Sequence, residues 1–225
     1  PAFGWSQRLK SEHFGFYQQV ATEFAALIDI DSWLINPLFD QCPAVNFMQR
    51  EGQECIQTRA ALLWQRIQQK YDQYNIRQPP FLVIKADQGT YGMAVMMIRS
   101  LSELESLNRK QRTRMARSKG GQSVTKAIIQ EGVYSFETMD TGAVAEPVVY
   151  LFGQHVVGGF YRVHDNKGSD ENLNAPGMNF TPLAFAESGQ HPGSSEPANR
   201  FYVYSVIARL AMLAAGRELQ SFTGT

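Results

Sequence analysis

A lysine followed by a glycine-rich turn is the feature of this sequence that most directly indicates chemistry. Residues 81–84 are all apolar and predict a short buried strand that ends at Lys85. Gly89 and Gly92 lie three residues apart in the turn that follows, before a second apolar run begins. Glycines let the backbone turn tightly and bring its N–H groups close to an anion, while the lysine adds a positive charge. The segment predicts a phosphate-binding loop, although a plain hairpin with glycines in its turn has the same pattern.

Three later segments carry polar side chains that suit a nucleotide and its metal ions. Residues 127–133 are a short apolar run that ends in a polar pair and a glycine, and they predict a further strand. Residues 145–163 predict two strands around a tight turn, and a polar segment follows at 165–174. Mg²⁺ prefers carboxylate and amide oxygens, and the planar guanidinium of arginine suits a phosphoryl group. The acidic, amide and arginine side chains in these segments could equally have a structural role, as part of a surface ion pair or a turn.

Composition places the chain among ordinary globular proteins and argues against several functions. The 225 residues balance 21 basic against 21 acidic side chains, which gives no general attraction to nucleic acid or to a membrane surface. No apolar run approaches the roughly 18–20 residues that span a bilayer. We therefore expect neither a nucleic-acid nor a membrane partner. Cys42 and Cys55 form no recognisable disulfide framework or metal-binding spacing, so we expect a reducing, cytoplasmic location.

One segment, residues 109–119, is strongly basic within this neutral protein. Its basic side chains are Arg109, Lys110, Arg112, Arg114, Arg117 and Lys119. The segment lacks the interleaved aromatic residues that often accompany nucleic-acid binding. A solvated helix or a loop is the expected structure, and a loop close to bound phosphates is the alternative.

Helical and strand patterns together predict an α+β fold. Apolar residues at helical spacing predict helices over residues 13–28, 51–74 and 201–219. A serine followed by acidic residues predicts another helix after Ser100. Because the strand-like runs begin near residue 80, we expect a mainly helical segment over residues 1–78. A second domain of antiparallel sheets with helices is expected over residues 79–225.

The ordered segments together resemble the ATP-grasp ligases, and glutathione synthetase in particular. Residues 84–92 resemble that family's lysine and glycine-rich phosphate loop. Residues 128–133 look like the strand and hinge that hold adenine, and residues 146–177 are similar to the region around the bound metals. The resemblance implies that residues 79–225 have an ATP-grasp-like fold.

A closer resemblance, extending over nearly the whole chain, is to the proteobacterial type of glutamate–cysteine ligase. It is carried by residues 33–37, 85–92 and 130–133. Enzymes of that group are considerably longer, so the chain is expected to be their C-terminal portion. The resemblance implies a ligase that uses ATP to form γ-glutamylcysteine from glutamate and cysteine through an acyl phosphate, the first step of glutathione synthesis.

The same resemblance implies ATP and Mg²⁺ as cofactors and assigns residues to them. The implied ATP-binding residues are Lys85, Gly89, Thr90, Tyr91, Gly92, Gln130, Glu131, Gly132 and Val133. Lys85 and Arg162 would be the catalytic residues, and the implied metal ligands are Glu146, Asp170 and Asn172.

Several alternatives stay open at this point. Glu171 or Asn174 could be the metal ligand instead, because residues 170–174 offer several registers, and the family more often has aspartate where this chain has Glu146. The alternative function is a non-catalytic ATP-grasp-like module that binds a nucleotide or another protein. The residues that recognise glutamate and cysteine, and the choice between a monomer and a homo-oligomer, are not predicted.

Overall fold

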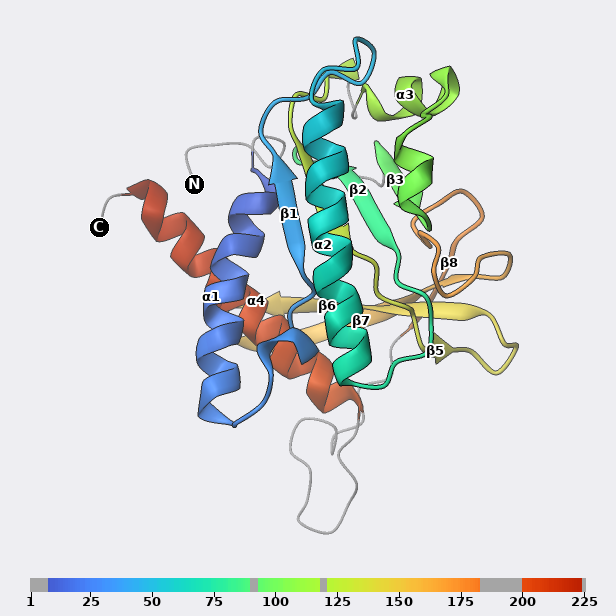
Figure 1. The fold of residues 1–225 in the computed structure, drawn as a ribbon. Helices are drawn as coiled ribbons and strands as arrows, with labels where there is room; N and C mark the ends of the chain where they lie inside the picture. The colour runs from blue at the N-terminus through green and yellow to red at the C-terminus, as the bar shows by residue number, and fades with distance from the viewer. Residues whose placement is uncertain (1–7, 90–92, 118–120, 183–199, 224–225) are drawn as a thin grey trace. The chain divides into compact units, whose positions relative to one another are not determined.

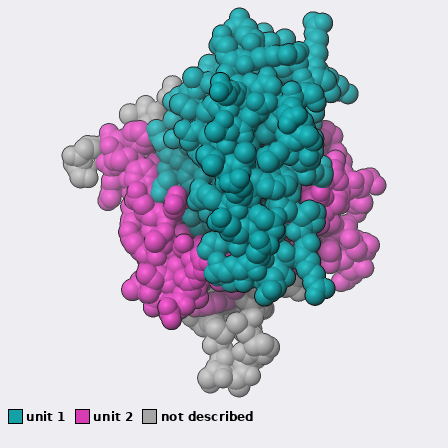
Figure 2. All heavy atoms as spheres, in the orientation of Figure 1, with its two compact units in different colours: residues 1–15, 36–133 teal, residues 16–35, 134–225 magenta. Residues whose placement is uncertain are grey.

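The computed structural model describes residues 8–89, 93–117, 121–182 and 200–223 (Figure 1). Within these ranges the chain forms four α-helices and two four-stranded antiparallel sheets, which confirms the predicted α+β class. The chain divides into two compact units that alternate along the sequence (Figure 2). Unit 1 comprises residues 1–15 and 36–133, and unit 2 comprises residues 16–35 and 134–225.

Unit 1 is built on a sheet with the strand order β1-β4-β2-β3, in which every neighbouring pair is antiparallel. The strands are β1 (Phe39–Cys42), β2 (Leu82–Ala86), β3 (Val95–Ile98) and β4 (Ala127–Glu131). The two central strands, β2 and β4, are buried along most of their length. Their apolar runs are therefore nearly continuous, because a strand buried on both faces does not need to alternate apolar and polar residues.

Helix α2 (Gln53–Gln73) packs on this sheet against β1 and β4 (Figure 1). Its buried residues recur at helical spacing and form one apolar stripe: Ile56, Ala60, Leu63, Ile67 and Tyr71. The helix predicted over residues 51–74 is thus confirmed, and its inward face follows from its sequence.

The two cysteines are bonded to each other, contrary to the expectation from sequence. Cys42 lies at the end of β1, and Cys55 lies in the first turn of α2. The expectation that they form no disulfide was wrong because two cysteines 13 residues apart carry no recognisable pattern. The packing of α2 on β1 brings the two side chains together.

The region after β3 differs in detail from the sequence prediction. Ser100 precedes only a short 3₁₀ helix, η3 (Leu101–Leu104), and its side chain makes no capping hydrogen bond. The next helix, α3, spans Arg109–Met115. Asn108 caps it, because its side chain accepts from the Gln111 amide while the Gln111 side chain accepts from the Asn108 amide. The basic stretch is therefore helical as far as residue 115.

Unit 2 contains a meander with the order β5-β6-β7-β8, again with antiparallel neighbours. The predicted hairpin around residues 153–154 is confirmed by β6 (Val144–Phe152) and β7 (His155–His164). The short flanking strands β5 (Glu137–Thr138) and β8 (Asn179–Pro182) were not predicted.

Two long helices complete unit 2. Helix α4 (Arg200–Thr223) packs on β6, and α1 (Lys10–Leu27) packs on α4 through the part of α1 that belongs to this unit. The shared core of the two helices consists of Tyr17, Val20, Ala21, Leu210 and Ala214. A short 3₁₀ helix, η2 (Ser32–Leu34), follows α1. None of the helices in the described ranges combines the length and apolar character needed to cross a bilayer.

Candidate functional site

Two of the predicted ATP-binding residues meet across the central strands of unit 1. Lys85 on β2 lies opposite Ile128 on β4, so Gln130, two residues further along β4, shares its face. The Lys85 Nζ donates a hydrogen bond of 2.8 Å to the Gln130 Oε1. This contact holds the ammonium at the end of β2, next to the start of the predicted phosphate loop.

The beginning of that loop is held by Lys10, at the start of helix α1. The Lys10 Nζ donates to the carbonyl oxygens of Ala86, Asp87 and Gly89, over distances of 2.8, 3.2 and 2.9 Å. Gly89 has φ of +90°, a conformation that favours glycine, and this turns the chain after Gln88. One ammonium therefore satisfies three carbonyl groups of a four-residue turn.

A second contact ties the same turn to α1. The Asp87 side chain is almost completely buried, and it accepts from the Ser11 amide at 2.8 Å and from the Ser11 hydroxyl at 2.7 Å. Burial lowers the pKa of Lys10 below its ordinary value; the Asp87 carboxylate opposes this shift, and the positive charge of Lys85 adds to it. The positive charge of Lys85 is thus felt at the ammonium of Lys10, which holds the turn.

Sequence reasoning did not identify Lys10 or Ser11 as part of this site. They lie 76 to 79 residues before their partners in the loop. Nothing in the spacing of residues 8–13 marks them as different from other residues at the start of a helix. Only the folded chain brings them to the loop.

The end of β4 is the predicted hinge for adenine, and most of its polar groups already have partners. The Glu131 amide donates to the Leu38 carbonyl, and the buried Glu131 carboxylate accepts from the Leu38 amide, both at 2.8 Å. The Gly132 amide donates to the carbonyl of Phe81 at 2.8 Å. A Cβ at position 132 would overlap the Phe81 ring, so this glycine is needed for packing. Val133, the next residue, is 60% exposed.

In unit 2, the predicted catalytic arginine pairs with one of the predicted metal ligands. Glu146 on β6 lies directly opposite Arg162 on β7, and the Nη1 of Arg162 lies 3.3 Å from the Oε2 of Glu146. The two side chains are 34% and 24% exposed, respectively. The buried Nε of Arg162 has no hydrogen-bond partner among the described residues. The guanidinium is thus held by a carboxylate through its Nη1 and keeps further N–H donors, the Nε among them.

The other predicted metal ligands lie in the turn-rich segment after β7. Asn172 Oδ1 accepts from the Asn174 amide at 3.1 Å, as in an Asx turn. Glu171 is engaged by its own loop, because its carboxylate accepts from the Lys167 ammonium and from the Gly168 amide, both at 2.9 Å. Asp170 is only partly buried.

Histidine 164 has a structural role at the end of β7. It is 4% exposed; its Nδ1 accepts from the Asn166 amide at 3.2 Å, and its Nε2 lies 3.1 Å from the Pro176 carbonyl oxygen. Both ring nitrogens therefore face partners in the same turn-rich segment. This ring stiffens the loop that carries Asp170 and Asn172.

The predicted metal ligands match Mg²⁺ by donor type. Glu146, Asp170 and Asn172 offer carboxylate and amide oxygens, the donors that a hard cation prefers. Among the residues that the structure describes, no group of three or more His, Cys, Asp or Glu side chains forms a ready-made metal cage. A Mg²⁺ ion bound with nucleotide phosphates needs only one or two protein carboxylates, so this finding is compatible with the predicted ligands.

The predicted site residues therefore fall into two groups. Lys85 and Gln130 are in contact in unit 1, where Gly89, Glu131, Gly132 and Val133 also lie, and Glu146 and Arg162 are in contact in unit 2, where Asp170 and Asn172 also lie. Three predicted ATP-binding residues, Thr90, Tyr91 and Gly92, lie outside the described residues.

Comparisons with known proteins agree with the resemblance seen in the sequence. Residues 1–219 match the family described as glutamate-cysteine ligase. The fold is similar to the crystal structure of a candidate γ-glutamylcysteine synthetase from Methylobacillus flagellatus KT, with a TM-score of 0.84 and 49% sequence identity. The match covers 99% of this chain and 53% of that chain, so this chain spans about half the length of that relative. No curated protein matches the chain.

Proposed function

Because the chain belongs to the glutamate–cysteine ligase family, we propose that it takes part in the ATP-dependent joining of glutamate to cysteine. The match over residues 1–219 is the observation that carries this proposal. The reaction forms an amide between the side-chain carboxylate of glutamate and the amine of cysteine. A carboxylate does not react with an amine unless it is activated, and ATP supplies the activation by converting it into an acyl phosphate.

In unit 1, Lys85 and the loop that begins at Gly89 bind the phosphates of ATP. The ammonium of Lys85 neutralises phosphate charge, and its hydrogen bond to Gln130 keeps it at the end of β2. The backbone at the end of β4 binds the adenine, and Val133 supplies the exposed apolar contact. Thr90, Tyr91, Gly92, Glu131 and Gly132 complete the proposed set of ATP-binding residues.

In unit 2, Arg162 stabilises the transferring phosphoryl group through its planar set of donors. Its pairing with Glu146 orients the guanidinium before any substrate binds. Glu146, Asp170 and Asn172 hold Mg²⁺, which neutralises phosphate charge when it is bound. Catalysis by these residues consists of positioning and charge stabilisation, and it needs no covalent intermediate with the protein.

The proposal includes an ATP-grasp-like fold for residues 79–225, after a mainly helical segment over residues 1–78. The antiparallel strands β2 to β4 and the hairpin of β6 and β7 support it, because they carry the residues assigned to the nucleotide and its metal. The dependence on ATP supports a cytoplasmic location.

Ligand-induced stabilisation of the purified protein tests the nucleotide site. MgATP should raise the melting temperature, because a ligand that binds only the folded state stabilises it by mass action. Lys85→Ala should remove most of this increase. Lys110→Ala is the matched control, because Lys110 is an exposed lysine on α3 outside the proposed site, and it should keep the full increase.

An assay of γ-glutamylcysteine formation in the intact enzyme tests the chemistry. Arg162→Ala should lower kcat much more than it raises KM for ATP, since its donors act on the transferring group. An unchanged melting shift in Lys85→Ala would remove Lys85 from the phosphate site. Wild-type activity in Arg162→Ala would remove Arg162 from the reaction.

A further inference from the structure

A cavity in unit 1 is not used by the residues assigned above. It has a volume of about 450 Å³, within the range of roughly 300–1,000 Å³ that is usual for small-ligand sites. The side chains that matter for its chemistry are Arg50, Gln53, Glu105, Asn108, Arg109 and Arg112. They come from the loop before α2, the first turn of α2, the segment that joins η3 to α3, and α3 itself. Two of them belong to the basic stretch of the sequence, whose role the proposed function does not explain.

The lining of this cavity carries an excess of positive charge. Three arginines face one carboxylate, that of Glu105. In the described part of the chain, the side chains of Arg50 and Arg109 make no hydrogen bond or ion pair. Like charges that gather around a concave surface repel one another, and the surrounding protein strengthens their field. A bound anion would relieve this repulsion.

Arg112 adds a buried donor to the same cavity. One end of its guanidinium donates to the Leu107 carbonyl, which fixes its orientation. Its Nε is buried and has no hydrogen-bond partner among the described residues. A buried polar group without a partner is uncommon in folded proteins, and a ligand or ion that binds beside the group can supply the partner.

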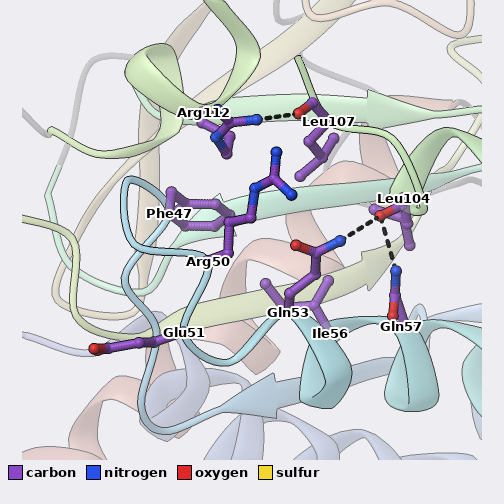
Figure 3. A pocket seen from close by; sticks show the side chains of 9 residues that line it. All are labelled: Phe47, Arg50, Glu51, Gln53, Ile56, Gln57, Leu104, Leu107 and Arg112. Atoms are coloured by element: carbon purple, nitrogen blue, oxygen red, sulfur yellow. Dashed lines mark hydrogen bonds between the residues drawn. The ribbon is translucent and has the colours of Figure 1, made fainter. Parts of the chain in front are cut away.

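Arg50 lines this cavity and also a smaller pocket that shares four of the lining residues, which is the pocket drawn in Figure 3. The backbone of Arg50 has a φ of +61°, which residues other than glycine rarely adopt. Such backbone conformations are often found at functional sites. Figure 3 shows its guanidinium reaching between Leu107 and Gln53, whereas the neighbouring Glu51 turns away from them. Gln53 itself is oriented by its hydrogen bond of 3.3 Å to the Leu104 carbonyl (Figure 3).

We propose that this cavity binds a small amino acid or dipeptide with two carboxylates, the class that includes glutamate and γ-glutamylcysteine. The guanidinium groups of Arg50 and Arg109 can each hold a carboxylate through two parallel hydrogen bonds. Glu105 provides the negative charge that pairs with the ligand's ammonium group. The amides of Gln53 and Asn108 add neutral donors beside these charges. The choice of this ligand class rests on the proposed function. The charge and shape of the cavity are observations that are independent of that function.

Calorimetric titration of the purified protein with L-glutamate tests the site directly. The double variant Arg50→Gln/Arg109→Gln should weaken glutamate binding by about tenfold or more, the loss expected when charge-assisted hydrogen bonds are removed. Both side chains are exposed and lack partners among the described residues, so the variant should fold normally. Arg114→Gln is the matched control, because Arg114 is an exposed arginine of α3 that does not line the cavity.

Three further probes identify the class of ligand. Glutarate, which has the two carboxylates but no ammonium group, should bind more weakly than glutamate. Glu105→Gln should remove most of that difference, because the carboxylate that recognises the ammonium is then neutral. γ-Glutamylcysteine should bind with the same dependence on Arg50 and Arg109 as glutamate. Inorganic phosphate should compete poorly.

Each remaining outcome overturns the proposal. It is wrong if neither glutamate nor γ-glutamylcysteine binds, if their binding survives the double variant, or if Arg114→Gln weakens it equally. Binding of phosphate with the same arginine dependence, without amino-acid binding, would make this an oxyanion site of another class. A parallel titration with MgATP keeps the two proposals separate. If the protein binds no MgATP, the proposed function is contradicted, while the glutamate titration still tests the cavity.

Discussion

The ammonium of Lys10 donates a hydrogen bond of 2.9 Å to the carbonyl of Gly89, although the two residues are 79 positions apart in the sequence. Gly89 is the last described residue before the tip of the proposed phosphate loop. The first turn of α1 therefore holds the base of this loop through Lys10, and through the contact of Ser11 with Asp87. The base of the loop is therefore held by a segment outside the lysine–glycine motif.

Replacing Lys10 with methionine should loosen this loop. The variant keeps most of the aliphatic stem but loses an ammonium that donates to three carbonyl groups. Hydrogen bonds to charged groups contribute about 1.5–3 kcal/mol each at most, and the partial exposure of Lys10 reduces this, so we expect a total loss near the lower end of that range. Urea unfolding measures the loss of stability.

The same variant should also weaken MgATP binding under conditions in which it is fully folded. A merely structural lysine would lower stability without changing nucleotide affinity, so the two measurements together separate the roles. Lys110→Met is the control for removing a lysine charge, since Lys110 is exposed and lies outside this network. Equal MgATP affinity in wild type and Lys10→Met would show that Lys10 does not position the loop.

Glu131 offers a test of whether the end of β4 is structural, nucleotide-binding or both. Glu131→Ala leaves the Leu38 amide without its acceptor, which should cost about 1–3 kcal/mol of unfolding free energy. Glu131→Gln keeps an oxygen acceptor and should retain most of this stability. If the carboxylate also contacts the nucleotide, Glu131→Gln will bind MgATP more weakly while it unfolds at nearly the wild-type urea concentration. Unchanged affinity would restrict the Glu131 carboxylate to a structural role.

Elements with a strong local pattern could be predicted from the sequence, and those stabilised mainly by their neighbours could not. The helix predicted over residues 51–74 matches α2 because apolar residues recur at helical spacing through its consecutive turns. Strand β1 (Phe39–Cys42) was missed because its four residues neither alternate nor form an apolar run. It forms because it pairs with β4, which lies far later in the sequence.

The candidate site shows the same division. The contact of Lys85 with Gln130 joins two segments that the sequence singled out, because both are strands with a clear apolar pattern. The contact of Glu146 with Arg162 follows from a hairpin whose two strands were predicted. Lys10 was missed because a long-range contact between a side chain and a backbone carbonyl leaves no mark in the spacing of residues.

The pH dependence of stability should reveal the buried hydroxyl of Tyr17. This hydroxyl donates to the Ile35 carbonyl at 2.9 Å, and burial raises its pKa above the ordinary value. The folded state therefore favours the neutral phenol. Its contribution to stability is fully present below about pH 10, the unfolded value, and is lost as pH rises through the higher folded pKa.

Tyr17→Phe isolates this contribution from the lysines that titrate in the same range. The variant should lose about 1 kcal/mol near neutral pH, because the hydrogen bond to Ile35 is absent. Its stability should then fall less steeply than that of the wild type above pH 10. Urea unfolding at several pH values measures both effects. Parallel curves for the two proteins would mean that Tyr17 titrates normally in the folded state.

The register of the proposed metal site can be decided by two neighbouring substitutions. Asp170→Asn removes an anionic oxygen that a hard dication prefers, so it should reduce the Mg²⁺-dependent part of ATP affinity by about tenfold and leave metal-free binding nearly intact. Glu171→Gln removes a charge one residue further along. The Glu171 carboxylate is already engaged by Lys167 and Gly168, so this change should mainly loosen the loop.

Nucleotide affinity with and without Mg²⁺ should therefore separate the two variants in the intact enzyme. A contact with the metal is lost only when Mg²⁺ is present, whereas a loosened loop weakens binding in both conditions. The hydrogen bond from the Asn174 amide to Asn172 would remain in both variants, because neither substitution touches it. If Glu171→Gln proves to be the variant that loses Mg²⁺-dependent affinity while Asp170→Asn keeps it, the metal is bound one residue further along the chain, and the ion pair with Lys167 must open for it to bind.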